Sequence, residues 1–270
     1  MRNKKSSYHF VLMLVLIFAL AAFPASVSAN HSWGKYHWAR TSNPFTLKVG
    51  DNVGSAWDTY LNEAISDWNP SSVLNLTKVT GSTNGSTCAP TSGRIEVCNA
   101  AYGTNGWLGI AQIWITRPSH IVQATTKVND TYFNQAQYNT PAWRRLVMCQ
   151  EVAHDFGLDH QDENFNNANL GSCMDYTNDP DGGGAYGPSN EHPNAHDFAQ
   201  LESIYRHLDS FTTVGAAAPA DAPAGFMNAD MHAKENWGAK VRESANGHSA
   251  IYVRDFGNGF KIITHVFWAE

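Results

Sequence analysis

The stretch that most constrains this chain runs Gln150-Glu151-Val-Ala-His154-Asp-Phe-Gly157-Leu-Asp-His160. Positions 150 and 154 lie one turn apart on a helix, so their side chains project from the same face. A glycine at 157 allows the helix to end sharply in a left-handed conformation and to bring His160 around. The spacing therefore indicates a metal site, with Glu151 placed as a general base beside a metal-activated water.

The residues before this stretch predict that it lies on a buried helix. Thr140 offers a hydroxyl cap, and Pro141 is favoured in the first turn of a helix. From Pro141 to about Phe156 the helix would present little polar surface on any side. We therefore expect it to run under the centre of a domain.

A second landmark follows at Ser172-Cys173-Met174-Asp175-Tyr176. It resembles the Met-turn of the metzincin zinc metalloproteases, the group that includes the matrixins, astacins and serralysins. The helix motif is similar to the zinc-binding signature of these enzymes, with Gln150 in place of the first histidine. The resemblance covers roughly residues 40–209 as an order of elements and is close only over residues 150–176.

The resemblance implies a secreted zinc-dependent endopeptidase with one catalytic zinc ion. Gln150, His154 and His160 would be the metal ligands, and Glu151 the catalytic base. Tyr176 would be a second catalytic residue that stabilises the oxyanion.

The resemblance also implies a place for the substrate. Met174 would form the floor of the site beneath the metal. Residues 108–115 resemble the edge strand that binds an extended protein or peptide substrate by strand addition in this family.

Gln150 leaves three outcomes open, because an amide oxygen reaches about as far as an imidazole but is a weaker ligand for zinc. Gln150 ligates zinc, helped by Tyr176 or a second water. Alternatively, His154, His160 and another residue from the 161–196 loop hold the metal. In the third outcome the site is empty and the chain is a catalytically inactive secreted binding module. The presence of Glu151 favours the first two, because an inactive site has no use for a general base.

The remaining pattern predicts an α+β fold with a twisted mixed sheet, an active-site helix, a Met-turn and a C-terminal helix. The expected strands are residues 45–49, 74–80, 94–99, 108–115 and 121–128. Helices are expected from about Ser55, from Pro141 and after the cap residue Asn194. Residues 161–193 read as a long irregular loop.

The predicted organisation has four parts. Residues 1–29 read as a removed signal peptide, with an uncleaved anchor as the alternative, because a basic start precedes a short apolar run. Residues 30–209 form the metzincin-like domain, residues 210–235 an Ala/Pro/Gly-rich linker, and residues 236–270 a small β segment. Within that segment, residues 239–243, 249–255 and 261–268 are expected strands joined at Asn-Gly turns.

The predicted signal peptide indicates the compartment, and the net charge indicates the class of partner. A net charge of −6 without basic runs argues against nucleic acid or an anionic membrane as the partner. We expect a secreted protein that is free of the membrane once its leader is removed. Since no cysteine-switch segment is found and little precedes the domain after Ala29, latency by a long propeptide is not expected.

Four cysteines in an oxidising compartment indicate disulfides, and they allow three connectivities. We favour Cys88–Cys98 and Cys149–Cys173. The second pair would link the active-site helix to the Met-turn, which are neighbours in the expected fold.

Other polar clusters carry weaker signals. His192, His196 and His207 show no diagnostic spacing and are interpreted as structural residues. The Asp-Pro-Asp-Gly-Gly-Gly run from Asp179 suggests Ca²⁺ binding less strongly than it suggests a bare turn.

Overall fold

The computed structural model describes residues 31–269, and the predicted signal peptide lies outside these residues. One nine-stranded sheet in the order β3-β2-β4-β6-β5-β9-β8-β7 forms the frame, with β1 paired to β6 off this path. The strands are β1 His37–Trp38, β2 Phe45–Asn52, β3 Leu74–Thr80, β4 Ile95–Ala100, β5 Trp107–Thr116, β6 His120–Asn129, β7 Ala239–Glu243, β8 Ser249–Gly257 and β9 Phe260–Trp268. The helices are α2 Asp58–Trp68, α3 Asp130–Phe133, α4 Pro141–His154 and α5 Ala195–Ile204, with a 3-10 turn η1 at Lys234–Asn236.

The sheet is mixed, as the sequence predicts. The pairs β2–β3, β2–β4, β4–β6 and β1–β6 are parallel. β5 then runs antiparallel to β6 on one side and to β9 on the other. The coarse prediction of an α+β fold is confirmed.

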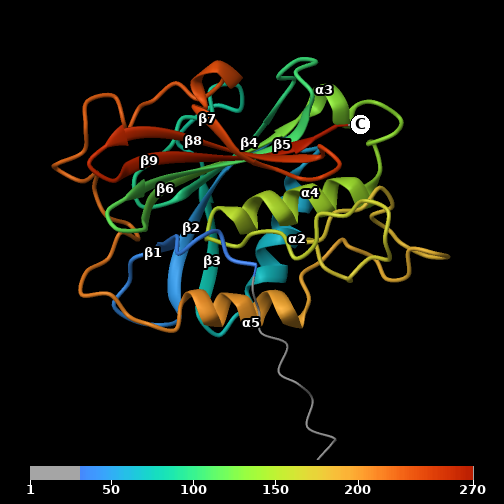
Figure 1. Ribbon diagram of the computed structural model, residues 1–270, viewed down its shortest axis with the longest axis horizontal. Coiled ribbons are helices and arrows are strands. Elements are labelled where there is room, and N and C mark those ends of the chain that lie inside the picture. The colour runs from blue at the N-terminus through green and yellow to red at the C-terminus, as the bar shows by residue number, and fades with distance from the viewer. Residues whose placement is uncertain (1–30, 270) are drawn as a thin grey trace, which may run out of the picture.

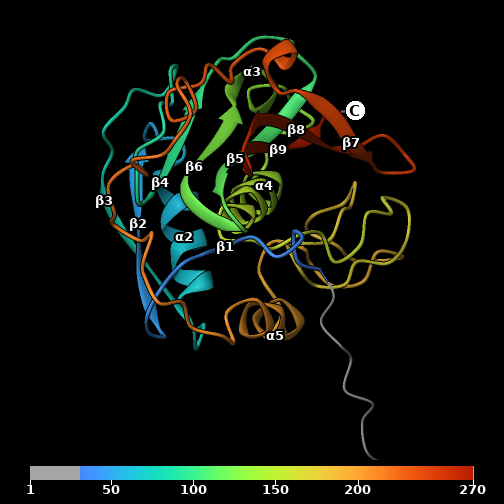
Figure 2. The same cartoon turned by 60° about the vertical axis from the view of Figure 1, so that its left-hand side comes forward.

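α2 and α4 lie together on one side of the sheet, and α5 lies below them, farther from the strands (Figures 1 and 2). The side chain of Thr140 accepts a hydrogen bond from the Trp143 N–H, and Pro141 is the first helical residue of α4. Twelve residues of α4 are buried, as the lack of a polar face predicts. This helix carries the central motif and therefore buries it under the sheet.

The three strands predicted for the C-terminal segment are present and extend the sheet of the preceding domain. β9 pairs with β5 along nearly its whole length, from Trp268 opposite Trp107 to Lys261 opposite Ile115. The expectation that residues 108–115 form an open edge strand is therefore wrong for this structure. The pattern of residues 108–115 predicts a strand, but it does not indicate whether another strand pairs with its edge.

Two hydrophobic clusters fill the two faces of this part of the sheet. The larger contains α2, α4 and the inner face of the strands, including Ile113, Ile263 and Phe267. The smaller joins the opposite faces of β5 and β9 to buried linker residues such as Phe226 and Met231. The linker thus contributes to the core.

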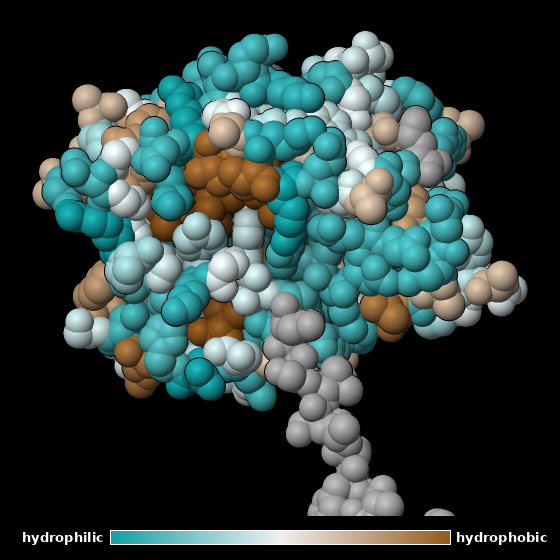
Figure 3. Space-filling view, viewed as in Figure 1, coloured by the Kyte–Doolittle hydropathy of each residue, from teal (hydrophilic) through white to brown (hydrophobic). Residues whose placement is uncertain are grey.

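Hydrophilic residues cover most of the face seen in Figure 3, where hydrophobic residues gather in a few patches. Within residues 31–269, no helix combines the length and apolar character needed to cross a membrane.

Candidate metal centre

The end of α4 brings its two motif histidines together. Gly157 has φ +100°, and a side chain there would collide with the backbone oxygen of Tyr36. The chain turns at this glycine and returns His160 to His154, so that their Nε2 atoms lie 3.1 Å apart. His154 is fully buried and His160 nearly so. The predicted convergence of these two side chains is confirmed.

The outer nitrogens of both rings are fixed by oxygen acceptors. His154 Nδ1 donates to the Leu158 carbonyl over 2.8 Å, and His160 Nδ1 donates to Glu163 Oε1 over 3.1 Å. Each neutral ring therefore has a lone pair on Nε2. Oxygen acceptors that hold the outer nitrogen in this way orient histidines that bind metals.

A cation between two facing lone pairs 3.1 Å apart would remove their repulsion. Burial, followed by the neighbouring His160, lowers the pKa of His154 to about 3, which disfavours a proton on that ring. Zinc bound at about 2.0–2.1 Å in a tetrahedral site separates two ligand nitrogens by about 3.3 Å. The residues present therefore fit a zinc ion.

The third imidazole of the centre comes from His265 on β9. Its ligand nitrogen, together with those of His154 and His160, belongs to a group whose atoms all lie within 4.8 Å of one another. Its ring stacks on that of His154 with centroids 3.8 Å apart, and neither of its nitrogens has a hydrogen-bond partner. Burial lowers the pKa of His265 well below its ordinary value, so the buried ring is neutral.

Strand register explains how His265 reaches the helix. It lies opposite Ala111 of β5, and directly opposed residues share one face of a sheet. Gly109 lies on the same face, since side chains alternate along a strand. A Cβ at Gly109 would come 2.7 Å from Glu151 Oε1, so the helix and the strand touch there. This face of β5 and β9 therefore covers the end of α4 that carries Glu151 and His154.

Sequence reasoning missed His265, although one signal was available. Ile263, His265 and Phe267 alternate along β9 and are all buried. A histidine at a core-facing position of an apolar strand requires a partner for its ring nitrogens. The motif in residues 150–196 contains no sign that this partner lies in the same site.

Glu151 and Gln150 are both fully buried. Neither carboxylate oxygen of Glu151 has a hydrogen-bond partner, and burial, with Asp155 adding to it, raises the pKa of Glu151 well above its ordinary value. Gln150 Nε2 donates to the Cys173 carbonyl over 2.8 Å, while its Oε1 has no partner. The only unused acceptor of Gln150 is thus the atom that would bind a metal.

The segment predicted to form the Met-turn, residues 172–176, lies next to this cluster. Tyr176 is buried with its ring centroid 4.2 Å from that of His160. Met174 is fully buried in the main core. Of the predicted site residues, the structure brings Tyr176 into direct contact with a histidine of the centre.

The C-terminal segment is also fastened to the loop beyond α4, and Figure 2 shows the β7–β8 hairpin facing that loop. Arg242 of β7 binds both carboxylate oxygens of Asp159, with Nη1 2.6 Å from Oδ2, and reaches Glu163 at 3.3 Å. Ser249 donates to Glu163 Oε1 over 3.2 Å. We call Arg242, Asp159 and Glu163 the latch, because these side chains tie β7 to the residues that flank His160.

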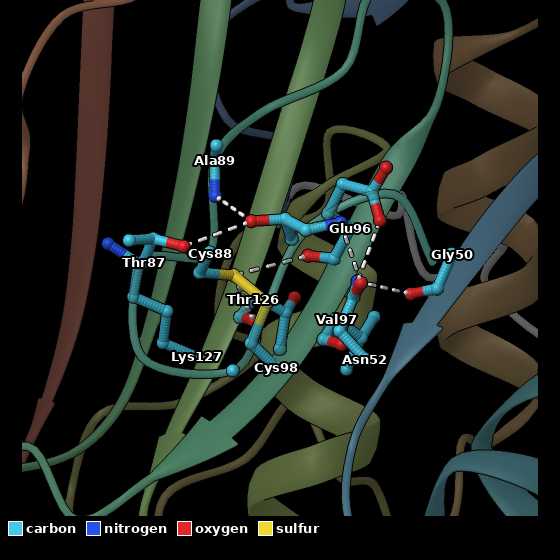
Figure 4. Close-up of a disulfide and its surroundings, with 12 residues drawn as sticks. Gly50, Asn52, Thr87, Cys88, Ala89, Glu96, Val97, Cys98, Thr126 and Lys127 are labelled. Atoms are coloured by element: carbon cyan, nitrogen blue, oxygen red, sulfur yellow. Dashed lines mark hydrogen bonds between the residues drawn. A yellow bond between two sulfur atoms is a disulfide. The ribbon is translucent and has the colours of Figure 1, made fainter. Parts of the chain in front are cut away.

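Both predicted disulfides are present. Cys88 is bonded to Cys98, and Cys149 to Cys173. The first braces the strand region drawn in Figure 4. The second joins α4 to the segment of residues 172–176, as expected.

Three groups of described residues could hold a metal ion, and none includes Asp179 or Asp181. Calcium binding there stays an expectation from the sequence.

No protein-family model matches this chain, and no curated protein matches it either. Among solved structures, it is similar to high choriolytic enzyme 1, a hatching enzyme zinc-protease from the medaka fish Oryzias latipes. The sequence identity is 11% and the TM-score 0.35, with 63% of this chain and 94% of that chain covered.

Proposed function

We propose that the chain is a secreted zinc-dependent endopeptidase in a closed form. The observation that carries this proposal is the convergence of His154, His160 and His265 beside a buried carboxylate that has no partner. A buried unpaired carboxylate is costly unless a metal ion or a proton compensates it. The two disulfides are in keeping with an extracellular protein.

In this proposal His154, His160 and His265 are the imidazole ligands. Gln150 keeps its predicted place as a ligand through Oε1, the atom left free when Nε2 bonds to Cys173. The residues of the 161–196 loop then serve the site indirectly, since Glu163 orients the ring of His160.

When the hairpin that carries His265 moves away, a zinc ion held by the remaining ligands would have an open position for a water molecule and would lower the pKa of that water to about 7. Glu151 would take the proton from the attacking water and pass it to the leaving amine. Its neighbours favour this role, because burial already raises the pKa of Glu151. Tyr176, in contact with His160, is the candidate for stabilising the oxyanion.

The pairing of β9 with β5 supports an extended peptide as the substrate. β9 itself is an extended segment that adds antiparallel to β5 and delivers the side chain opposite Ala111 to the metal centre. A substrate strand bound in this way would use the same edge. β9 and the substrate would therefore compete for β5.

The closed form has a direct consequence for activity. Glu151, His154 and His265 have no solvent-exposed surface, and the edge of β5 is occupied. A substrate can reach the base only when the β8–β9 hairpin moves away. Closure by this C-terminal segment would give latency without an N-terminal propeptide.

The same closure favours one alternative, a catalytically inactive secreted binding module. In that case the centre holds the hairpin to the domain and the β5 edge never opens. The two functions differ in what happens when the hairpin is released.

The test uses the mature chain with a cleavage site for a specific protease placed in the exposed linker segment 217–220. Zinc content and hydrolysis of a peptide library are measured before and after cleavage, with and without chelator. We expect zinc in the uncut protein and chelator-sensitive hydrolysis that rises after the cut. Glu151→Ala should abolish hydrolysis and keep the zinc. If both the cut and the uncut protein hold zinc but neither hydrolyses peptides, the chain is the inactive binding module. If neither holds zinc, both the metal centre and the enzymatic function are contradicted.

A further inference from the structure

A second group of histidines lies where β1 pairs with the start of β6. β1 pairs in parallel with β6, and the register sets His37 directly opposite His120. After α5 the chain returns to these strands, where the Asp209 N–H donates to the Arg40 carbonyl over 2.9 Å. Three segments that are distant in sequence thus bring His37, His120, His207 and Asp209 together.

Three of these residues, His37, His120 and Asp209, offer ligand atoms that all lie within 4.8 Å of one another, and His207 lies beside them. Asp209 Oδ1 lies 3.5 Å from His37 Nε2, 3.3 Å from His120 Nε2 and 3.7 Å from His207 Nε2. His207 Nε2 is 3.1 Å from His37 Nε2. Ligand atoms around a tetrahedral zinc ion are separated by about 3.3 Å. The four separations given above, from 3.1 to 3.7 Å, lie on both sides of that value.

The outer nitrogens of His37 and His120 are already occupied. His37 Nδ1 donates to the Lys35 carbonyl over 2.7 Å, and His120 Nδ1 donates to the Arg117 carbonyl over 3.3 Å. Carbonyl acceptors leave the lone pair of each neutral ring on Nε2, which points inward.

The carboxylate of Asp209 is oriented in a similar way. Its Oδ2 accepts from the backbone and the guanidinium of Arg40 at 3.1 and 3.0 Å. Its Oδ1 is left to the three imidazoles. With neutral rings, the Nε2 lone pairs of His37 and His120 therefore face the anionic Oδ1 of Asp209, and a cation between them would remove this repulsion.

We propose that His37, His120, His207 and Asp209 form a second metal site, which binds a divalent ion of the zinc class. Three imidazoles and one carboxylate suit zinc better than calcium or magnesium, which prefer oxygen ligands. The set contains four protein ligands, as structural zinc sites do, and no general base is part of it.

The setting gives the ion both a role and a route. His37 and His120 are buried, whereas the side chain of His207 is 50% exposed. All four residues line a surface cavity of about 780 Å³, through which an ion can enter. A bound ion would tie β1 and the start of β6 to the segment after α5. It would thereby fix the N-terminal part of the chain and the beginning of the linker.

The experiment counts zinc in the mature chain after it has been stripped with chelator and reloaded with Zn²⁺ alone. We expect about two zinc ions per chain, one for each histidine group. His120→Ala should lose one of them and keep the ion at His154 and His160. His265→Ala should weaken the other ion and leave this one in place. The two variants therefore separate a failure of the proposed active centre from a failure of the second site.

A second variant protects the test against misfolding. His207→Ala removes a half-exposed ligand, so the fold should survive while zinc affinity at this site falls at least tenfold. Cobalt-loaded protein should lose part of its tetrahedral visible absorption in the same variant. His192→Ala is the control, because His192 is exposed and pairs with Asp67 at 2.7 Å away from both groups.

If wild-type protein and His120→Ala hold the same number of zinc ions, the site does not exist. The four side chains then form a polar cluster that holds no metal ion. Unchanged zinc affinity and cobalt absorption in His207→Ala would remove His207 from the ligand set and contradict the four-ligand site.

Discussion

The imidazole of His265 stacks on that of His154, with ring centroids 3.8 Å apart. One residue lies on the helix of the central motif, and the other lies on the last strand of the sheet. The contact joins the C-terminal segment to the candidate metal centre. It also explains how a chain with glutamine at the first motif position can still bring three imidazoles together.

The first prediction concerns the source of the third imidazole. His265→Ala should lower zinc affinity at this centre at least tenfold, because an imidazole ligand is lost and no other histidine joins the group. Competition with a chromophoric zinc chelator measures the effect. His232→Ala, at an exposed histidine of the linker, should behave like the wild type. Equal affinity in all three proteins would show that His265 is not a ligand.

The second prediction concerns Gln150. If its Oε1 faces the metal, Gln150→His should hold zinc more tightly, because imidazole is the stronger ligand. Activity of the cut protein need not rise, since the hydrogen bond from Nε2 to Cys173 is lost and the new ring has no such support. The same chelator competition decides the matter: unchanged affinity would remove Gln150 from the ligand set.

Much of this centre follows from local sequence patterns. The spacing of His154, Gly157 and His160 predicts their convergence, because a helical turn and a glycine exit are local geometry. The Cys149–Cys173 bridge was also predicted, since the resemblance to the metzincins makes α4 and the Met-turn neighbours.

The missed features depend on long-range strand pairing. His265 reaches the centre only because β9 pairs with β5 in one register. His37 meets His120 through the pairing of β1 with β6. A register between distant strands is set by packing over the whole sheet and leaves no short motif. For the same reason the pattern of residues 108–115 could not indicate that the edge is covered.

The third prediction concerns the latch. Arg242→Ala removes the pair with Asp159 and the contact with Glu163. Because the Arg242 side chain is 41% exposed, we expect a loss of only about 1 kcal/mol in stability. The hairpin should nevertheless open more often, so limited proteolysis in the linker should become faster and basal peptide hydrolysis should rise. Lys240→Ala is the control, as its partner Glu243 lies on the same strand. Identical proteolysis rates in the two variants would contradict the latch.

The fourth prediction concerns the disulfide beneath the centre. Replacing both Cys149 and Cys173 by alanine opens a loop with a sequence separation of 24. Loss of this cross-link should lower the free energy of unfolding by about 3 kcal/mol. Urea denaturation measures it, with the Cys88/Cys98 double alanine variant as the comparison. That loop has a separation of only 10, so its loss should cost less. The reverse order would indicate that local packing, rather than loop closure, dominates.

The last prediction uses Glu96, a fully buried carboxylate beside the Cys88–Cys98 bridge (Figure 4). Its oxygens accept hydrogen bonds from four side chains, those of Asn52, Ser82, Thr91 and Arg94. Burial pushes the pKa of Glu96 upward, but these four hydrogen bonds outweigh burial and lower the pKa below its ordinary value. The folded protein therefore favours the ionised form more strongly than the unfolded chain does.

The sign of the pH effect follows from that shift. The pKa of Glu96 is lower in the folded state than the unfolded value of 4.5, so its contribution to stability is fully present above that pH. It is lost as the pH falls through the folded-state pKa. Glu96→Gln should cost about 1–3 kcal/mol at pH 7, since Arg94 loses its charged partner. Urea denaturation should show that wild type and variant differ less in their free energy of unfolding at pH 3 than at pH 7. The exposed Glu235→Gln should show no gap at either pH. An equal gap for Glu96→Gln at both values would mean that shape, rather than charge, makes Glu96 stabilising.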